Sequence, residues 1–371
     1  MKVLYLTEGY SPHDRRFMEA AANLLGHQVV YVPWRGRPRS RPQDVPQGVT
    51  WAGHLGPLTL GRWRVWAQRL RRLAEDFQPD VIHAGPLPWG GLFPAWWRTW
   101  PLVSMSWGSD VLWHGRRKPW LRTLIRWVLR RSILLLADCR AVADTAHAWG
   151  MPRQRILVFP WGTDLDVFHP GTEPALRASW GWPEEAFVWV HARTWNRYYG
   201  ADVALRGFLR AWRQESRLRL VLLGGGPLEG WLRREIVRHR AQGVVRIVGR
   251  VPEEHLARYF RAANGYLSMS RSDGSSVTLL QALASGLPAV VSDIPGNREW
   301  VTPGVEGYLV PVGDVGALAR TLVQVARMDA KGRAAMAQAA RRRAEAYADW
   351  KRHIRELDRV YRLAVEWGVR P

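Results

Sequence analysis

The sequence predicts an α/β protein made of two Rossmann-like domains and a helical C-terminal segment. Two observations carry this prediction. Short buried apolar runs alternate with segments of helical periodicity in both halves of the chain, which is typical of parallel sheets covered by helices. The length of 371 residues is large for one hydrophobic core and favours two domains.

The first half of the chain contains short apolar runs that read as strands. The expected strands are 2–7, 28–32, 80–83, 101–106, 133–137 and 156–159. Helical spacing covers 15–25, which stops at Gly26, and 120–131. Residues 160–185 are rich in proline, glycine and acidic residues, so they predict a connection between the domains.

A second α/β series follows this connection. Its expected strands are 187–191, 218–223, 244–248, 265–269 and 289–292. After Asp314 the chain is helical almost to its end, and 329–367 is too long for one globular helix, so we expect a break near 348–349. We therefore expect domains over 1–165 and 166–348 and a final helix over 349–371.

Composition limits the partners and the compartment. The formal net charge of +22 favours nucleotides, anionic lipid headgroups or nucleic acid, although an arginine-rich composition without a function gives the same charge. The arginines form no single stripe and no nucleic-acid motif is visible, so we expect no nucleic-acid partner. Cys139 is the only cysteine, which argues against disulfides and a cysteine-based zinc site. The first residues read as a strand rather than a signal peptide, so we expect a cytoplasmic protein.

The 23 tryptophans are unusually many, and several lie among arginines, as in 62–72 and 116–131. One interpretation is amphipathic helices that pack on a sheet while their arginine heads reach water. The other is an interfacial surface that lies on an anionic membrane. The second interpretation would make the protein peripheral on the inner face of the membrane.

The most informative segment is 268–300. A strand end is followed by the polar turn 273–276, an apolar helix, a stop at Gly286 and Pro288, and a buried strand. The turn offers capping hydroxyls where the helix begins. A helix N-terminus at the carboxyl end of a parallel strand attracts anions, so the segment predicts a phosphate-bearing ligand. A strand–turn–helix unit without a ligand has a similar pattern.

This segment resembles the donor-site block of the retaining glycosyltransferases of family 4 (group 1), which have the GT-B fold. Residues 282–291 match that block closely, Asp273 occupies its first acidic position and Gln281 its second. Residues 160–170 resemble the family's interdomain motif, and 349–361 resemble its C-terminal helix. The resemblance covers essentially the whole chain. It implies two Rossmann-like domains facing across a cleft, with the last helix crossing back to the first domain.

The resemblance implies catalytic roles for Arg193 and Asp273. Arg193 would hold the donor diphosphate, since a leaving phosphate needs a fixed cation. The family's lysine five residues on is absent, and Arg197, Tyr198 or Tyr199 could replace it, although Arg197 could equally be a solvated loop residue. Asp273 would bind a hydroxyl of the donor sugar, and a helix cap is the alternative, compatible role.

The remaining donor-binding candidates also follow from the resemblance. Backbone amides at the helix start would contact the phosphates, from Ser275, Ser276, Val277 and Thr278. Glycines and one arginine at other strand ends would approach the diphosphate, the nucleotide pocket or the base, namely Gly9, Gly224, Gly225, Gly249 and Arg250. At Gly224 and Gly225 a simple turn is the alternative.

Gln281 stands where the family has a ribose-binding glutamate. Its amide can still make a bidentate contact, so we expect Gln281→Glu to bind donor similarly or more tightly. The alternative is a chain with reduced or lost activity.

The first domain adds one catalytic candidate. Residues 106–110 resemble the family's His-Gly-x-Asp, with Trp107 in place of the histidine, and Asp110 would orient the acceptor or the sugar. A turn or helix cap is the alternative. No Asp-x-Asp lies at a strand end, and 164–166 has this spacing only in the interdomain segment. His83, His114 and His191 have no second ligand at metal spacing, so we expect no metal.

The sequence thus predicts an enzyme that moves a sugar from a nucleoside diphosphate sugar to an acceptor hydroxyl with retention of configuration. The reaction would use front-face attack and no cofactor beyond its donor substrate. We expect a glycan or lipid-linked acceptor. The competing hypothesis is a catalytically weak sugar-nucleotide-binding or membrane-docking subunit. An epimerase of the same fold is disfavoured because its own motifs are absent.

Overall fold

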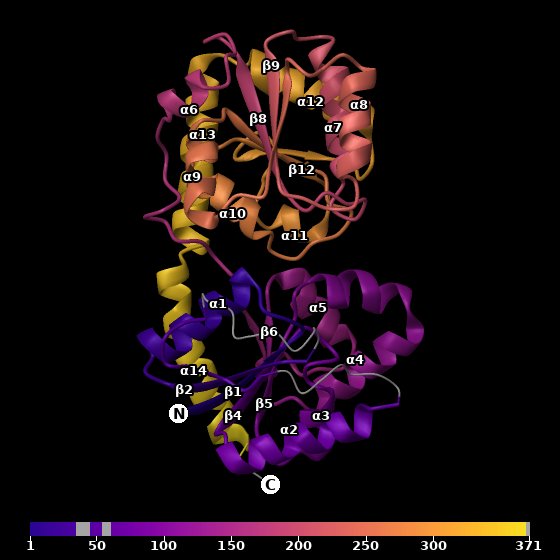
Figure 1. Cartoon of the computed structure of the whole chain (residues 1–371), viewed down its shortest axis with the longest axis vertical. Helices are drawn as coiled ribbons and strands as arrows, with labels where there is room; N and C mark the ends of the chain where they lie inside the picture. Colours follow the sequence, from indigo (N-terminus) through magenta and orange to yellow (C-terminus); the bar gives the residue numbers. More distant parts are fainter. Residues whose placement is uncertain (35–44, 54–60, 369–371) are drawn as a thin grey trace. The chain divides into compact units, whose positions relative to one another are not determined.

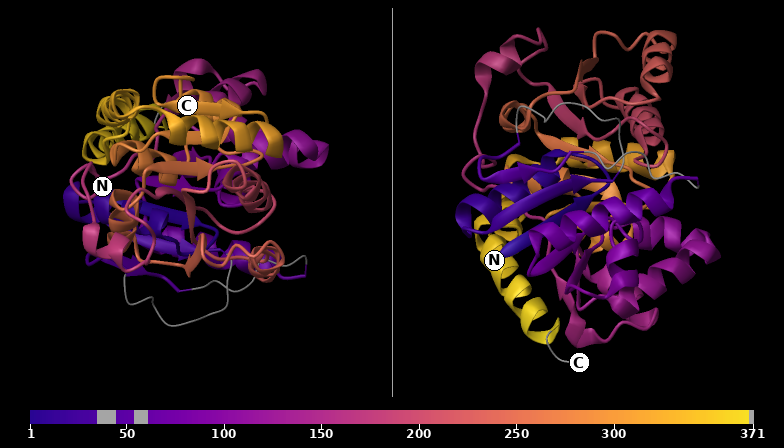
Figure 2. Two further views of the ribbon diagram at one scale, coloured as in Figure 1. Left: turned by 90° about the horizontal axis from the view of Figure 1, so that it is seen from above. Right: turned by 60° about the horizontal axis from the view of Figure 1, so that its bottom comes forward.

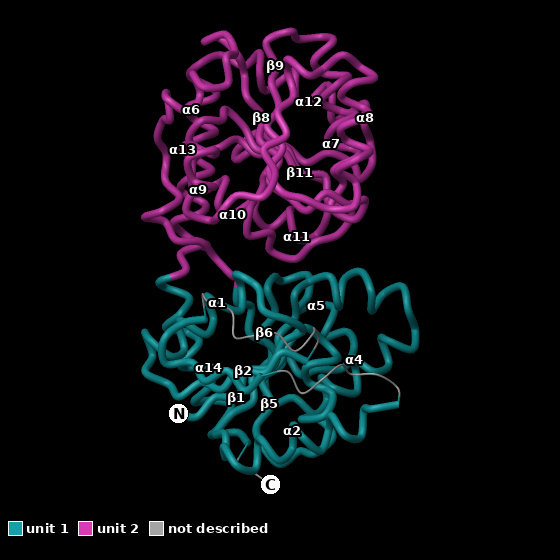
Figure 3. The backbone as a smooth tube through the Cα atoms, in the orientation of Figure 1, with its two compact units in different colours: residues 1–159, 351–371 teal, residues 160–350 magenta. Residues whose placement is uncertain are grey.

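A computed structural model describes residues 1–34, 45–53 and 61–368 (Figure 1). The chain divides into two compact units (Figure 3). Unit 1 comprises Met1–Phe159 and Lys351–Pro371, and unit 2 comprises Pro160–Trp350. Each unit contains a parallel sheet with helices packed against it, which confirms the predicted α/β class.

Unit 1 is built on a seven-stranded parallel sheet in the order β3-β2-β1-β4-β5-β6-β7. Its strands are β1 (Lys2–Thr7), β2 (Gln28–Pro33), β3 (Val49–Trp51), β4 (Val81–Ala84), β5 (Leu102–Met105), β6 (Leu134–Ala137) and β7 (Ile156–Val158). All of them except β3 match predicted strands. β3 was not predicted; it is an edge strand in which the exposed Thr50 separates two apolar residues.

The helices of unit 1 cover its sheet. They are α1 (Pro12–Glu19), the π-helical turn η1 (Ala20–Leu24), α2 (Trp63–Phe77), α3 (Leu92–Trp97), the π-helical turn η2 (Asp110–Gly115), α4 (Pro119–Arg131), α5 (Arg140–Ala148) and the short 3₁₀ turn η3 (Arg153–Arg155). On α4, Leu121, Ile125 and Val128 are buried, whereas Arg122 and Arg130 are exposed. This arginine-rich segment is therefore an amphipathic helix whose apolar face is buried, which is compatible with both interpretations of its sequence.

The last helix, α14 (Trp350–Gly368), belongs to unit 1 from Lys351 onward. Leu357, Val360 and Tyr361 on this helix are fully buried. The Tyr361 hydroxyl lies 2.8 Å from Nδ1 of His83 on β4, so the end of the chain is attached to the first sheet. Figure 2 shows α14 running beside the strands of unit 1. The prediction that the final helix returns to the first domain is confirmed.

Unit 2 has a six-stranded parallel sheet in the order β10-β9-β8-β11-β12-β13. Its strands are β8 (Phe187–Ala192), β9 (Leu218–Leu223), β10 (Val245–Gly249), β11 (Gly265–Ser268), β12 (Ala289–Ser292) and β13 (Gly307–Val310). Its helices are α6 (Pro174–Ala178), α7 (Ala201–Trp212), α8 (Glu229–Arg238), α9 (Glu253–Arg261), α10 (Val277–Ala284), α11 (Pro295–Arg298), α12 (Val315–Arg327) and α13 (Ala330–Tyr347). The predicted break at 348–349 separates α13 from α14. β13 was not predicted.

The strand order of unit 2 fixes where a ligand can approach. The chain steps outward from β8 through β9 to β10 and then starts again on the other side of β8 with β11. The connections that follow β8 and β11 therefore lead in opposite directions along the sheet. Open α/β sheets bind ligands at such a switch point, at the carboxyl ends of their strands. Unit 1 has the same arrangement at β1 and β4.

Candidate functional site

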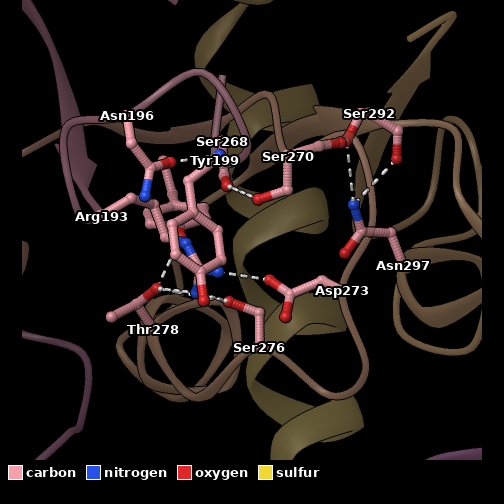
Figure 4. A network of polar contacts seen from close by, with 11 residues as sticks. Arg193, Asn196, Tyr199, Ser268, Ser270, Asp273, Ser276, Thr278, Ser292 and Asn297 are labelled. Atoms are coloured by element: carbon pink, nitrogen blue, oxygen red, sulfur yellow. Dashed lines mark hydrogen bonds and ion pairs between the residues drawn. The ribbon is translucent and has the colours of Figure 1, made fainter. Parts of the chain in front are cut away.

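Arg193 and Asp273 meet at the switch point of unit 2. Arg193 directly follows β8, and Asp273 lies in the loop between β11 and α10. Because β8 pairs with β11, their loops emerge side by side, and Arg193 Nη2 forms an ion pair with the Asp273 carboxylate. Arg193 Nη1 donates to Ser276 Oγ at 2.6 Å and to Thr278 Oγ1 at 3.4 Å. Figure 4 shows this network around the first turn of α10.

The Arg193 side chain is held in a buried position. It is 10% exposed, and its guanidinium carbon lies 4.2 Å from the centre of the Tyr199 ring. Burial lowers the pKa of Arg193, but the Asp273 charge together with the neighbouring Tyr199, Tyr266 and Tyr198 raises it by more, so the net shift of the pKa is upward. Burial raises the pKa of the Asp273 carboxyl, opposed by the Arg193 charge and the Gly274 amide. The site therefore keeps a fixed cation. The Nε atom of Arg193 has no acceptor in residues 1–34, 45–53 and 61–368.

The N-terminus of α10 differs from the predicted capped turn. Ser276 is the N-cap residue, but its side chain makes no capping hydrogen bond. Its hydroxyl instead accepts the charge-assisted hydrogen bond from Arg193, and Ser275 Oγ accepts from Trp300 Nε1 at 3.2 Å. The first amides of a helix have no intrahelical acceptor, so those at Val277 and Thr278 add a partial positive charge beside Arg193. The helix start and the guanidinium thus converge on one anion-binding position.

A second loop supports the Asp273 segment from behind. A Cβ atom added at Gly296, on α11, would lie 2.4 Å from the carbonyl oxygen of Gly274, so only glycine permits this close approach. Asn297 Nδ2 donates to the carbonyl of Ser292 at 2.8 Å, and Ser292 Oγ donates to the carbonyl of Ser270 (Figure 4). Sequence reasoning missed these supporting residues because their partners lie in another loop.

The glycines after β9 pack closely against the loop that carries Arg193. A Cβ atom at Gly224 would lie 2.3 Å from the carbonyl oxygen of Arg193, and the Trp195 amide donates to the Gly225 carbonyl at 3.0 Å. These glycines therefore let the loop after β9 pack against the loop that carries Arg193, which positions the cation. A direct contact between a ligand and Gly224 or Gly225 stays a prediction.

Gly249 and Arg250 lie at the end of the neighbouring strand. Gly249 has φ +94°, and a Cβ atom there would have no neighbour within 4 Å, so space remains beside its backbone. Arg250 is exposed, and its Nε would be 3.1 Å from a Cβ atom added at Gly225. The side chain of Arg250 thus lies beside Gly225 in the loop after β9, and its contact with a base stays a prediction.

Gln281 lies one helical turn after Thr278 and is 3% exposed. Its Nε2 donates to Oε1 of Glu253 at 3.0 Å. Its Oε1 is buried and has no donor in the part of the chain that the structure describes. Glu253, at the start of α9, was missed by sequence reasoning, because a contact across 28 residues leaves no periodic signal.

Arg197 and Tyr199, two of the residues that could replace the family's lysine, lie in different surroundings. Arg197 is exposed, and its carbonyl accepts from Nε of Arg271 at 2.9 Å. The ring of Tyr199, rather than its hydroxyl, contacts Arg193. The role of Arg197 toward a diphosphate stays a prediction.

In unit 1, Asp110 is buried among hydrogen-bond donors of its own unit. Its carboxylate accepts from Ser106 Oγ at 2.7 Å and from the amides of Leu87 at 2.8 Å, Val111 at 2.9 Å and Trp107 at 3.4 Å. Burial raises its pKa, against the effect of these donors. Asp110 therefore ties the loop after β5 to the loop after β4, and its contact with an acceptor stays a prediction.

Gly9 lies in the loop between β1 and α1, and this loop leads to the fully buried Asp14. The Asp14 carboxylate accepts from the hydroxyls of Ser11 and Tyr5. Burial raises the pKa of Asp14 to about 6. Sequence reasoning placed this loop near the ligand but did not identify its buried acid.

The histidines at strand ends are neutral structural groups. Burial lowers the pKa of His83 to about 3 and that of His191 to about 4, and Nδ1 of His191 lies 2.9 Å from the Leu267 carbonyl. Within the described ranges, no cluster of three or more His, Cys, Asp or Glu residues could hold a metal ion. Metal independence of the reaction stays a prediction. None of the described helices combines the length and apolarity needed to cross a bilayer.

Comparisons with known proteins agree with this architecture. Residues 172–343 match the family described as glycosyl transferases group 1, and residues 15–167 match glycosyltransferase family 4. The D-inositol 3-phosphate glycosyltransferase of Nocardia farcinica is 29% identical over 84% of this chain and 69% of its own length. That of Kribbella flavida is 30% identical over 64% of this chain and 58% of its own length. The chain spans about three fifths of the length of the first relatives it matches.

Solved structures share the fold at lower identity. HepE from Anabaena, solved in complex with UDP-glucose, has a TM-score of 0.80 at 17% identity, with 97% of this chain and 98% of that chain covered. The apo form of the lipopolysaccharide outer core galactosyltransferase WaaB has a TM-score of 0.72 at 14% identity, with 97% and 99% covered. Together with the two family matches, which cover both halves, this shows that the chain belongs to the group 1, family 4 glycosyltransferases of GT-B fold.

Proposed function

We propose that this chain transfers a glycosyl group from a nucleoside diphosphate sugar to an acceptor hydroxyl, with retention of configuration. The observation that carries the proposal is the position of Arg193 at the uncapped start of α10. A cation and a helix N-terminus directed to one point are suited to a diphosphate, which carries more charge than either feature alone would balance. Support for UDP as the nucleotide comes from the UDP and UDP-glucose complexes of HepE.

The protein would contribute position and charge to this reaction. As the bond between the sugar and the phosphate breaks, negative charge grows on the leaving diphosphate, and Arg193 with the α10 amides would stabilise it. Asp273 stands against Arg193, so a hydroxyl of the sugar attached to the diphosphate would lie beside its carboxylate and donate a hydrogen bond to it. The acceptor oxygen would attack from the face that the diphosphate leaves, and the proton of the acceptor hydroxyl would pass to the departing diphosphate.

One structural observation favours a second candidate, a subunit that binds sugar nucleotide without turnover. The Arg193 charge is already matched by Asp273, and the only other arginine proposed for the diphosphate, Arg197, is exposed. A site with one net cation fewer would stabilise a leaving diphosphate less. Binding without release of nucleoside diphosphate would identify this case.

The proposed acceptor is a glycan or a lipid-linked glycan, and the proposed docking partner is an anionic membrane. Relatives include the amylovoran biosynthesis glycosyltransferase AmsK of Erwinia amylovora, 29% identical over 53% of this chain and 48% of its own length. On unit 1, Trp96 and Trp120 are 56% and 58% exposed. The helices α2 and α4 of the same unit are rich in arginine, and a combination of aromatic and basic residues is typical of interfacial surfaces.

A turnover assay tests the transfer proposal. The chain is incubated with UDP- and GDP-sugars, with and without a lipid-linked glycan extract, and release of nucleoside diphosphate is measured. We expect release from at least one donor. Asp273→Asn, which keeps the shape of the side chain, should slow release by on the order of a hundredfold while nucleoside diphosphate still binds. Binding of a donor with no release in any mixture would favour the non-catalytic subunit, and no binding of any donor would refute both.

A further inference from the structure

The contact between Gln281 and Glu253 has a chemical consequence for the donor site. Gln281 replaces an acidic residue at this position, and the structure brings a different carboxylate to it. Gln281 Nε2 donates to Glu253 Oε1 at 3.0 Å. Glu253 is exposed at the first turn of α9, so its second carboxylate oxygen can accept a further hydrogen bond.

The other half of the Gln281 amide has no partner. Its Oε1 is buried and receives no hydrogen bond from any described residue, and the residue is only 3% exposed. A buried acceptor without a donor is costly, so such an atom in a native site usually meets a ligand or water. A hydroxyl group is a donor that would satisfy it after a small rotation of the amide.

Gln281 also lies close to the anion-binding position, on the same face of α10. It follows Thr278 by three residues on α10, and residues at this spacing share one face of a helix, about 5–6 Å apart. Thr278 Oγ1 is a hydrogen-bond partner of Arg193 Nη1. A group attached directly to a diphosphate bound at Arg193 would therefore reach the pair formed by Gln281 and Glu253. In a nucleoside diphosphate that group is the ribose.

We propose that Glu253 and Gln281 together bind the two ribose hydroxyls of the donor nucleotide, with Glu253 supplying the carboxylate that position 281 lacks. The Glu253 carboxylate accepts from one hydroxyl and Gln281 Oε1 accepts from the other. The hydrogen bond from Gln281 Nε2 holds Glu253 in place and fixes which half of the amide faces the nucleotide. This inference rests on the proposed nucleotide-sugar function and adds Glu253 to its specificity-determining residues.

The arrangement reverses the sequence-based expectation for Gln281→Glu. A glutamate at 281 would lose the donor to Glu253 and place two carboxylates at hydrogen-bonding distance, so they would repel each other. Gln281→Glu should therefore weaken nucleotide binding. The double variant Glu253→Gln with Gln281→Glu restores one amide and one carboxylate and should recover it.

The experiment is a calorimetric titration of the full chain with UDP, ADP and GDP, each beside its 2′,3′-dideoxy counterpart, which lacks both hydroxyls. We expect the parent protein to prefer the ribonucleotide. Glu253→Gln should weaken ribonucleotide binding by about tenfold or more and leave the dideoxynucleotide nearly unchanged, because one charge-assisted hydrogen bond is lost. The matched control is Glu254→Gln, which neutralises the neighbouring exposed carboxylate on α9 and should change neither affinity.

The outcomes separate this inference from the proposed function. Equal effects of Glu253→Gln on both nucleotides, or no effect on either, would overturn the ribose assignment while the bound diphosphate still supports the donor site. Failure of the double variant to recover affinity beyond Gln281→Glu would also overturn it. Failure of the parent protein to bind any of the nucleotides would overturn the proposed function and this inference together.

Discussion

Arg193 is the residue whose environment most constrains the chemistry. A guanidinium that is 10% exposed loses much of its hydration, and the Asp273 carboxylate and Ser276 hydroxyl replace it. Removing one member of such a pair leaves the other charge buried and costs about 3–5 kcal/mol of stability. Substituting Arg193 or Asp273 alone therefore changes folding as well as binding. The double variant Arg193→Ala with Asp273→Ala leaves no unpaired charge, so it separates the effect on binding from the effect on folding.

Asp14 in unit 1 gives a pH-dependent prediction. Its pKa in the folded chain is raised to about 6 because the carboxyl is buried. A raised carboxyl pKa contributes stability that is fully present below the unfolded pKa near 4 and is lost as the pH rises through about 6. Asp14→Asn cannot ionise, so its melting temperature relative to the parent should be higher at pH 8 than at pH 5. The expected change in the free energy of unfolding, parent relative to variant, is roughly 1–1.5 kcal/mol between pH 5 and pH 8, because about half of the total effect is already lost at pH 5.

Thermal unfolding of both chains at the two pH values measures this effect. Asp144→Asn is the matched control, because this carboxylate is 60% exposed and pairs with Arg153 at the surface. A parent and an Asp14→Asn variant that lose stability in parallel between pH 5 and pH 8 would show that Asp14 is ionised throughout.

At the scale of elements, α10 shows what the sequence could predict and what it could not. The polar turn, the apolar helix and the Gly286 stop are local signals, and the predicted helix start and end agree with the structure. The predicted capping hydroxyl is wrong because Arg193, which follows another strand, takes it as an acceptor. Such a contact is created by the pairing of β8 with β11 and is invisible in a local window.

The helices α2, α3 and α4 lead to a prediction about membranes. Trp63 on α2 lies 6.1 Å from Trp96 on α3, and Trp89 before α3 lies 6.4 Å from Trp120 on α4, measured between ring centres. We expect the chain to sediment with anionic vesicles more than with neutral ones and to be released by salt, because each basic residue near the surface contributes about 1 kcal/mol. Replacing Trp96 and Trp120 by alanine should lower the bound fraction.

Tyr347→Ala provides the control for this experiment, because Tyr347 is 56% exposed but belongs to unit 2. Equal sedimentation with neutral and anionic vesicles at low salt would refute docking. It would leave the transfer proposal untouched, because the two rest on different residues.

At the scale of the whole molecule, strands with a buried apolar run were predictable. Runs such as 3–6 and 220–223 are apolar and buried, as expected for strands covered on both faces. β3 and β13 were not predicted, and both are edge strands that are only partly buried. The return of α14 to unit 1 followed from the resemblance, and the Tyr361–His83 contact spans 278 residues that no local pattern links.

The same division applies to the site. The identities of Arg193, Asp273 and Gln281 came from motif positions, whereas the partners of Gln281 and the packing role of Gly224 depend on tertiary contacts. The residues that reshape the site, Glu253 and Tyr199, lie outside the donor-site block. A motif therefore located the chemistry, but only the fold showed which side chains complete it.

The central claim is that Arg193 and the start of α10 bind the diphosphate of a nucleotide. The most direct measurement is a calorimetric titration of the parent chain, Arg193→Ala, and the double variant Arg193→Ala with Asp273→Ala. Arg233→Ala is the control, because Arg233 forms only a surface ion pair with Glu229. We predict that both Arg193 variants bind the nucleoside diphosphate about 1.5–3 kcal/mol more weakly, while Arg233→Ala binds like the parent. Unchanged affinity of the Arg193 variants for every nucleoside diphosphate that binds the parent would contradict the claim.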